Sequence, residues 1–418
     1  MARTDAIVLG AGIVGTSAAL HLRARGLSVA LIDRQAPGEG TSFGNAGVIE
    51  GSALLPVSFP RNLGTLVAHA LKLSAQSNYN LAALPALAPW LLAYFRASAP
   101  AMQASIGRDL RPLMALSRAE HHALAGPAGA MGLLTPTGWV KVYDRQADLD
   151  ATALERRLAD ELGVAYTVLD PAGVKALEPA LNPGLAGGVH WHDCDNVSDP
   201  GGLVKAYAAL FESRGGLLLT GDARSLRRSG EAWRVETAEG PVDAKVVVVA
   251  LGPWSLDVLK PLRLPAPVPL AVKRGYHVHF APLPGKGLSR AVVDRAGGFS
   301  LQWTKGGIRA TTGIEFARRE DPPTDIQVRR VIAHVRKRLP VGDVVATAPW
   351  LGCRPAFPDS KPMIGAAPGL PGVFLDFGHS HWGLTLGPVS GRLLADLVTG
   401  ATPFTDPAPF APTRFSRA

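Results

Sequence analysis

The sequence is poor in cysteine. Its two cysteines, Cys194 and Cys353, lie far apart in a chain of 418 residues, and neither belongs to a CxxC pair. A disulfide framework and a zinc cage of paired cysteines are therefore excluded. This scarcity fits a protein of a reducing compartment.

Charged residues are also scarce, at 18% of the chain against 47% hydrophobic residues, which excludes a disordered chain because a core can form. Lys and Arg exceed Asp and Glu by 43 − 34 = +9, but the basic runs, at 227–228, 318–319 and 329–338, are short. With aromatic residues at only 6% and no basic tract interleaved with them, we expect no nucleic-acid partner. The positive balance is compatible with anionic ligands or an anionic membrane surface.

Long hydrophobic runs are missing as well. The longest, at 81–95, contains two prolines and is too short for a membrane-spanning helix. The chain enters its first apolar run at residue 6 without a signal-like segment and cleavage site. We therefore expect a cytoplasmic protein, with peripheral contact to the inner face of the membrane left open; the sequence does not determine the oligomeric state.

Glycine and proline are plentiful, at 46 and 35 residues, and predict many tight turns in a chain long enough for about two domains. An apolar run at 6–9, the turn GAGIVG, a helical pattern at 16–24 and a second apolar run at 28–32 predict strand, turn, helix and strand. The segment 52–125 predicts a largely helical insertion. Further elements are expected as strands within 132–143, at 217–220, 233–236, 245–251, 270–312 and 373–377, and as helices near 150–162, 200–214, 325–338 and 385–399.

The turn contains Gly10, Gly12 and Gly15, spaced as GxGxxG. The first glycine allows the tight turn, the second lets the backbone approach a pyrophosphate, and the third lets the helix pack on the strand. Asp33 ends the second strand, where its carboxylate can accept a ribose hydroxyl and disfavours NADP by repelling a 2′-phosphate. The motif predicts dinucleotide binding and leaves NAD and FAD open. The polar, glycine-rich segment 38–47 favours an extended cofactor, with Ser42 on its second phosphate.

Four segments together resemble the FAD-dependent D-amino-acid oxidase superfamily, and in particular bacterial D-amino-acid dehydrogenases. They are GAGIVG with Asp33; TSFGNAG at 41–47; VVVALGPWS at 247–255; and GCRPAFPDSKPMIG at 352–365 followed by GHSHWGLTLGP at 378–388. The resemblance covers nearly the whole chain. It implies FAD as the cofactor and an α/β fold, in which a Rossmann-type FAD-binding domain is interleaved with an α+β substrate domain built on an antiparallel or mixed sheet.

The resemblance also implies the domain boundaries and the cofactor contacts. The FAD-binding domain is expected at 1–51, 145–262 and 342–418, and the substrate domain at 52–144 and 263–341. FAD contacts are expected at Gly10, Ala11, Gly12, Ile13, Val14, Gly15, Asp33, Arg34, Thr41, Ser42, Asn45, Ala46, Gly47, Val48, Ala223, Ala250, Gly252, Trp254, Gly378, His379, Gly383, Leu384 and Thr385. Backbone amides at the start of the helix near 385 would stabilise negative charge on the reduced flavin.

On the substrate side, Arg354 matches the family arginine that binds the substrate carboxylate, because a planar guanidinium holds a carboxylate through two hydrogen bonds. The alternative for Arg354 is a structural ion pair with Asp359. Strand alternation places Tyr276 and its neighbour 277 on opposite faces, and we choose Tyr276 as the one that faces the pocket, against a packed sheet tyrosine. His379 and His381 are expected near the flavin, with structural imidazoles as the alternative.

Two further motifs resemble functional sites, but we assign a structural role to each. HWHDCD at 190–195 resembles a metal site, but the two histidines lack a clear third ligand, so we assign no metal. Cys353 lies where some amine-oxidising relatives link FAD covalently; here Arg-Pro follows it, unlike their pattern, and a buried inert cysteine is favoured.

The predicted activity is oxidation of the Cα–N bond of a D-amino acid or cyclic imino acid, of which a D-proline-like compound is one. Hydride transfer to flavin would give an imine or, after hydrolysis, a 2-oxo acid. The resemblance implies electron transfer to a quinone or another acceptor. The alternatives are a glycine- or sarcosine-type oxidase that uses O₂, and a noncatalytic FAD-binding subunit of a larger complex.

Overall fold

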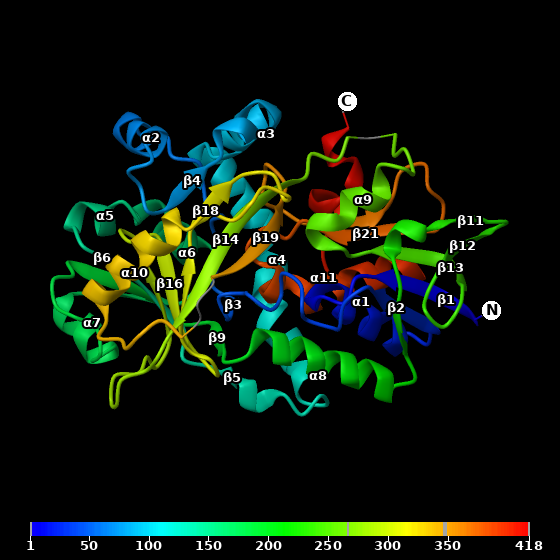
Figure 1. The fold of residues 1–418 in the computed structure, drawn as a ribbon, viewed down its shortest axis with the longest axis horizontal. Helices are drawn as coiled ribbons and strands as arrows, with labels where there is room; N and C mark the ends of the chain where they lie inside the picture. The colour runs from blue at the N-terminus through cyan, green and yellow to red at the C-terminus, as the bar shows by residue number, and fades with distance from the viewer. Residues whose placement is uncertain (1, 266, 346–348, 417–418) are drawn as a thin grey trace.

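The computed structural model describes residues 2–265, 267–345 and 349–416 and shows two lobes between which the chain passes several times (Figure 1). One lobe is built on an eight-stranded sheet of order β10-β2-β1-β13-β12-β11, in which β21 continues from β13 and β20 pairs with β21. Its strands are β1 (Ala2–Leu9), β2 (Val29–Asp33), β10 (Leu217–Thr220), β11 (Arg227–Ser229), β12 (Ala232–Val235), β13 (Val242–Val249), β20 (Met363–Ala366) and β21 (Val373–Phe377).

The central strands of this sheet are parallel and buried on both faces. β1 runs parallel to β2 and β13, and β13 runs parallel to β21. Along β1 the side chains alternate, so Ala6 and Val8 face one hydrophobic core while Ile7 and Leu9 face the other. This two-sided burial explains the uninterrupted apolar runs and confirms the predicted Rossmann-type sheet.

The helices on the first core bring together distant parts of the chain. α1 (Ile13–Ala24) packs against α11 (Gly383–Thr399), and both share a core with α4 (Pro100–Ala125) and α8 (Pro200–Ser213). The close α1–α11 approach depends on glycine, because a Cβ at Gly391 would lie 2.7 Å from the amide nitrogen of Ala18. The opposite core includes the short α9 (Ser255–Leu259).

The second lobe is a mixed sheet of order β4-β18-β14-β17-β16-β15-β6-β8-β7, with β19 also paired to β14. Most of its pairings are antiparallel, as predicted, and α10 (Ile326–Arg338) packs against the central strands through Val328, Val331 and Val335. The strands are β4 (Ser77–Tyr79), β6 (Trp139–Tyr143), β7 (Tyr166–Leu169), β8 (Gly187–Trp191), β14 (Ala271–Phe280), β15 (Ala291–Asp294), β16 (Phe299–Thr304), β17 (Gly307–Thr312), β18 (Ile314–Phe316) and β19 (Trp350–Ala356).

The described residues also form a small sheet and five further α-helices. The small sheet has the order β3-β9-β5. Its strands are β3 (Val48–Glu50), β5 (Leu134–Thr135) and β9 (Cys194–Val197), and the helices are α2 (Leu63–Ala70), α3 (Leu84–Ala97), α5 (Gln146–Asp150), α6 (Ala153–Glu161) and α7 (Pro171–Leu177). α2 and α3 project from the body at the top of the view in Figure 1. The segment 52–125 is thus largely helical, as its pattern predicts.

The predicted domain boundaries differ from the sheet membership in three places. β7 and β8 lie within the predicted FAD-binding range 145–262, yet β8 pairs with β6 in the second sheet. β19 lies within the predicted range 342–418 but pairs with β14 of the same second sheet. α4, which we expected in the substrate domain, packs on α11. In each case a pairing between residues distant in sequence decides where the element lies.

No single helix in the described ranges has the length and apolar composition needed to cross a membrane. Leu81–Ala97 and Pro100–Ala125 meet those criteria only as a pair, which is bent by 85°.

Candidate flavin and substrate site

A cavity of about 1090 Å³ is lined by residues of both lobes and of the helical segment between 52 and 97. Its lining includes the glycine loop after β1, Asp33, the 38–48 segment, the 250–254 turn and the loop before α11. This volume lies just above the range that ligand pockets usually have, about 300–1000 Å³. The cavity is therefore large enough for a dinucleotide and a small substrate together.

The glycine loop has the shape that a dinucleotide requires. Gly10 has φ = 106°, and a Cβ there would lie 2.6 Å from the carbonyl oxygen of Ala250. A Cβ at Gly15 would lie 1.9 Å from the carbonyl oxygen of Gly10, so only glycine allows α1 to start this close to the strand. The start of α1 thus faces the cavity with its first-turn amides, a favourable position for a pyrophosphate. Ala11, Gly12, Ile13 and Val14 line the cavity beside these glycines.

Asp33 and Ser42 hold this loop in place. The carboxylate of Asp33, at the end of β2, accepts hydrogen bonds from the Ala11 amide at 2.8 Å and the Gln35 amide at 3.0 Å. The hydroxyl of Ser42 accepts a bond from the Ile13 amide at 3.1 Å. Ser42 therefore lies at the start of α1, where the phosphates would bind, and its neighbour Thr41 donates to the Cys353 carbonyl at 3.1 Å.

The segment 45–48 forms another wall of the cavity. Arg309 donates to the Asn45 carbonyl at 2.7 Å, and the Gly47 amide donates to the Asn45 side chain at 2.8 Å, with Gly47 at φ = 81°. The hydroxyl of Thr385, in the first turn of α11, donates to the carbonyl of Val48 at 3.3 Å. These bonds connect the segment to α11. Asn45, Ala46 and Val48 line the cavity itself.

The loop before α11 is backbone-strained and buried. Gly378 has φ = 85°, and a Cβ there would lie 2.1 Å from the Phe357 ring. Ser380 adopts φ = 56°, an uncommon value for a residue other than glycine, and its side chain is buried. Gly383, Leu384 and the residues before them line the cavity, so the free amides at the start of α11 are available to a cofactor.

The adenine end is expected beyond Asp33. Ala223, Ala250, Gly252 and Trp254 all line the cavity, as does Arg34, whose guanidinium lies 5.3 Å from the centre of the Trp254 ring. Each expected cofactor residue except Gly15, Gly47 and Thr385 therefore lines the cavity, and those three shape its walls from behind.

Arg354 enters the cavity from β19, directly opposite Lys273 of β14. A Cβ at Gly275 would lie 2.2 Å from Nη1 of Arg354, so this glycine makes room for the guanidinium. Within the described residues, the guanidinium donates to the carbonyls of residues 274, 312 and 313, at 3.3–3.4 Å. Burial lowers the pKa of Arg354 to about 10, at which it remains charged at neutral pH.

The ion-pair alternative for Arg354 is not what the structure shows. Asp359 instead pairs with Arg414, at 2.9 Å between Oδ2 and Nε. Among residues 2–265, 267–345 and 349–416, no carboxylate forms an ion pair with Arg354. A buried guanidinium with long backbone contacts and a cavity in front of it retains the capacity to bind a carboxylate.

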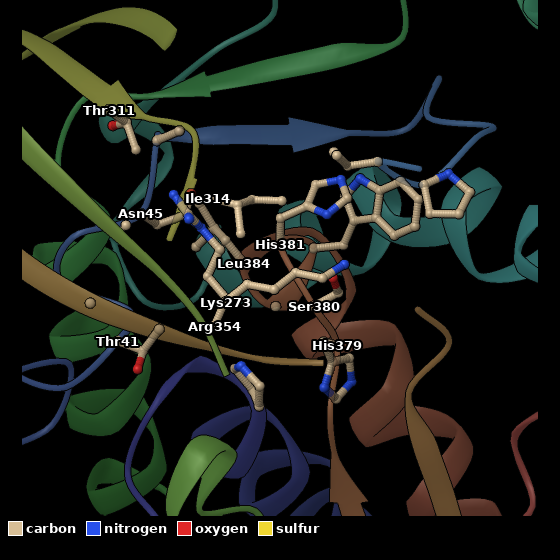
Figure 2. A pocket seen from close by; sticks show the side chains of 18 of the residues that line it. Thr41, Asn45, Lys273, Thr311, Ile314, Arg354, His379, Ser380, His381 and Leu384 are labelled. Carbon is tan, nitrogen blue, oxygen red and sulfur yellow. The ribbon is translucent and has the colours of Figure 1, made fainter. Parts of the chain in front are cut away.

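Lys273 is a cavity residue that the sequence reasoning missed. Its side chain is 2% exposed, and Nζ lies 3.9 Å from the centre of the Tyr94 ring and 5.5 Å from that of Trp90. Within the described part of the chain, Nζ has no hydrogen-bond partner. Burial and the neighbouring Arg354 lower its pKa to about 7. In Figure 2, Lys273, Arg354 and His381 lie in the same part of the cavity.

Alternation along β14 places Lys273 on the opposite face from Tyr276, so the choice of Tyr276 did not point to Lys273. Lys273 and Gly275 share the face of β14 that looks onto Arg354, and Tyr276 lies on the other face. The Tyr276 hydroxyl donates to Glu315 at 2.7 Å and accepts from the Thr324 amide at 2.9 Å. Tyr276 is among the residues that line the cavity, although its hydroxyl is engaged in a buried network with Glu315. Its assignment as a pocket-facing side chain stays a prediction.

The two histidines differ in their surroundings. His379 is buried, with Nε2 at 3.0 Å from the Ser390 hydroxyl and 3.4 Å from Asp376. His381 lies against the ring of Trp382 and faces the cavity. Burial lowers the pKa of each to about 3, with the positive charges of Lys273 and Arg354 contributing at His381. Both imidazoles are neutral at physiological pH.

Glu50 is a second cavity residue that the sequence reasoning missed. Burial raises its pKa to about 7, and the indole nitrogen of Trp382 donates to its carboxyl at 3.2 Å. Its position depends on the pairing of β3 with β9, which no local pattern reveals.

The HWHDCD motif and Cys353 lie in structural surroundings. The ring nitrogen Nε2 of His190 lies 3.2 Å from the Thr137 carbonyl and 3.1 Å from Arg290. Over the described ranges, no group of three or more His, Cys, Asp or Glu side chains could hold a metal ion. Cys353 is a buried free thiol whose pKa is raised by burial.

The fold and the cavity together define a dinucleotide-binding oxidoreductase with a buried arginine that lines the cavity. The family model for FAD-dependent oxidoreductases, DAO, matches residues 5–397, and the chain belongs to this family. The sequence is 30% identical over 420 residues to a D-amino-acid oxidase of Bradyrhizobium diazoefficiens, with 98% of each chain covered. It is 31% identical over 432 residues to a D-amino acid dehydrogenase of Methylobacterium sp., with 99% of each covered.

The structure superposes on glycine oxidase from Geobacillus kaustophilus with a TM-score of 0.75, at 23% identity over 99% of both chains. The predicted fold class, family and FAD cofactor are confirmed, and the protein is an FAD-dependent amino-acid oxidoreductase.

Proposed function

We propose that the protein is an FAD-dependent D-amino-acid dehydrogenase that oxidises the Cα–N bond of a D-amino acid or cyclic imino acid, including D-proline-like compounds. The observation that carries this proposal is Arg354, a cavity-facing guanidinium with no acidic partner in the described residues, next to the loop that precedes α11. Bound FAD supplies the hydride acceptor, and hydrolysis of the product imine gives a 2-oxo acid.

The chain's own groups orient the substrate. Arg354 binds the α-carboxylate through two hydrogen bonds, and Lys273, opposite it across the β14–β19 pairing, adds positive charge to the same part of the cavity. His381 remains neutral at the edge of this site, so it does not repel the substrate's amino group. The amides at the start of α11 offer hydrogen bonds where negative charge develops.

The electron acceptor and the location belong to the proposal as well. Both D-amino-acid oxidase and D-amino acid dehydrogenase are names of relatives near 30% identity. We propose a quinone or another acceptor rather than O₂, in a cytoplasmic protein with peripheral contact to the membrane. A glycine- or sarcosine-type oxidase is the second candidate, favoured by a glycine oxidase relative of Pseudomonas aeruginosa at 28% identity. A noncatalytic FAD-binding subunit is the third.

One experiment separates these functions. The flavin absorbance of the holoenzyme is followed anaerobically with a panel of D- and L-amino acids that includes glycine, sarcosine, D-proline and hydroxyprolines. Bleaching by D-amino acids is expected, whereas bleaching by none would support the noncatalytic reading. With the active substrate, stoichiometric H₂O₂ in air would identify an oxidase, and dye reduction without peroxide a dehydrogenase.

The Arg354→Ala variant tests the carboxylate site. We expect a steep rise in KM with the spectrum of the bound flavin intact, because Arg354 contacts the substrate rather than the glycine loop. Unchanged kinetics would remove Arg354 from the site.

A further inference from the structure

Residues 51–108 contain no aspartate or glutamate. The chain has 34 acidic residues among 418, so a segment of this length would hold about five at the average frequency. Its charged residues are all basic: Arg61, Lys72, Arg96 and Arg108. Acid-free surfaces of this extent favour an anionic partner.

The same segment exposes large apolar side chains. In α2, no residue is buried, although a helix in a globular protein usually buries one face. Leu63, Leu73 and Leu81 are 75%, 72% and 67% exposed. We define the α2–α3 face as the exposed apolar residues Val57, Leu63, Val67, Leu71, Leu73, Leu81 and Leu92 together with the basic residues Arg61, Lys72 and Arg96. Exposed apolar patches of this kind mark interaction sites.

Contacts join the segment just before α2 to α3. The guanidinium of Arg61, just before α2, donates to the carbonyl of Phe95 in α3 at 2.8 Å and lies 4.3 Å from its ring centre. The ring of Phe59 meets Phe95 edge-on, and the hydroxyl of Tyr94 in α3 donates to the Val57 carbonyl. Both helices project from the same side of the molecule in Figure 1.

The inner side of this projection is a wall of the cavity. Phe59 and Leu66 line the cavity from the α2 segment, and Leu84, Leu91 and Tyr94 line it from α3. One thin layer of apolar side chains therefore separates the exposed leucines from the site that contains Arg354 and Lys273.

We propose that the α2–α3 face docks on an anionic lipid bilayer. The exposed leucines enter the interfacial region, and Arg61, Lys72 and Arg96 lie against the anionic headgroups, the arrangement of interfacial helices. The functional consequence of docking rests on the proposed function: a lipid-soluble electron acceptor in the bilayer would reach the cavity wall without crossing water.

The charges favour a bilayer over a second copy of the chain. A twofold dimer would place the face against itself and bring two sets of cations together without any acid from either set. An anionic bilayer offers both the apolar phase and the opposite charge.

Cosedimentation of the holoenzyme with vesicles tests the proposal. We expect it to sediment with vesicles of mixed phosphatidylglycerol and phosphatidylcholine, and at least ten-fold less with phosphatidylcholine alone. Binding should weaken at about 1 M NaCl, where the Debye length falls to about 3 Å. Failure to sediment with the anionic vesicles, or equal sedimentation with both kinds, overturns the proposal.

The variant combines Leu63→Ser, Leu71→Ser and Leu73→Ser, none of which lines the cavity. Its control combines Leu217→Ser, Leu283→Ser and Val345→Ser, which are also exposed but lie outside the face. We expect the first to lose at least ten-fold in vesicle binding and the control to bind like the parent. Both should reduce a water-soluble dye at the parental rate, which shows that the site is folded.

Two further outcomes show whether the bilayer docking or the proposed function is the part that fails. A dimer in gel filtration that the leucine variant converts to monomer, without vesicle binding, identifies a second copy as the partner and overturns the bilayer. Vesicle binding together with a flavin that no amino acid bleaches sustains the docking face and rejects the proposed function. Bleaching of the flavin without vesicle binding supports the proposed function and rejects the docking face.

Discussion

Replacement of Lys273 by methionine is expected to stabilise the holoenzyme while it weakens substrate binding. Lys273 is 2% exposed, and its ammonium has no hydrogen-bond partner in the described residues and lies near the positive charge of Arg354. Methionine fills a similar volume without the charge. The native lysine therefore lowers the stability of the fold, at a site where its positive charge would help to bind the substrate carboxylate.

The magnitude follows from the lowered pKa. The unfolded chain has the ordinary lysine pKa of 10.5 and the folded chain about 7. At pH 7 this difference destabilises the fold by about 4 kcal/mol, from which the cation–π contact with Tyr94 subtracts up to about 2. A gain of about 2–4 kcal/mol raises the unfolding midpoint of a chain this long by about 2–5 °C.

The sign with pH is fixed by linkage. Between the folded and unfolded pKa values, the unfolded state binds more protons, so the parent gains stability as the pH rises. The advantage of Lys273→Met is therefore largest at pH 7 or below and falls by about 2 kcal/mol at pH 9. Thermal unfolding of parent and variant holoenzymes at pH 7 and pH 9, without substrate, measures both quantities.

Lys141→Met is the matched control. Lys141 is a second cavity lysine, but its Nζ lies 3.4 Å from the Glu155 carboxylate, and despite burial this partner helps to hold the pKa of Lys141 above its usual value. Its removal leaves Glu155 unpaired and should lower stability by about 2 kcal/mol. A midpoint that falls in both variants, or a gain at Lys273 that does not shrink at pH 9, would refute the reasoning.

Two glycine variants test the walls of the site. Gly275→Ala places a Cβ 2.2 Å from Nη1 of Arg354, so steady-state kinetics should show KM raised at least ten-fold with normal flavin content; an unchanged KM would mean that the guanidinium moves aside freely. Gly15→Ala places a Cβ 1.9 Å from a backbone carbonyl oxygen, and the purified protein should lose most of its flavin absorbance; full flavin content would contradict the tight loop. Gly132→Ala, where a Cβ meets open space, is the control for both.

Local patterns were sufficient for the nucleotide-binding half of the fold. The strand, glycine turn, helix and Asp33 lie within 33 residues. The interactions that shape the loop join residues that are close in the sequence, or they depend on the glycines themselves. The apolar run of β13 likewise indicated a buried parallel strand. These features could be predicted because their side-chain periodicity is decided locally.

The substrate side was harder because distant pairings decide it. Alternation in β14 correctly separated residues 276 and 277, but the face that looks onto the cavity is set by β19, which places Arg354 opposite Lys273. The position of α4 against α11 is a similar case: its helical pattern is local, whereas its packing partner lies more than 250 residues later. The sheet membership of β8 and β19 depends on such pairings too, so local patterns could not place these strands.

The excess positive charge is not evenly spread, although the basic residues are scattered in the sequence. Residues 51–108 contribute +4 to the net +9, since they contain four basic residues and no acidic one. Two more cations, Lys273 and Arg354, are buried next to each other without an ion-pair partner among the described residues. Burial of two adjacent like charges is unfavourable, and a rigid antiparallel pairing is what keeps them from separating. A carboxylate substrate would supply the missing negative charge inside the cavity, as anionic lipid would outside it.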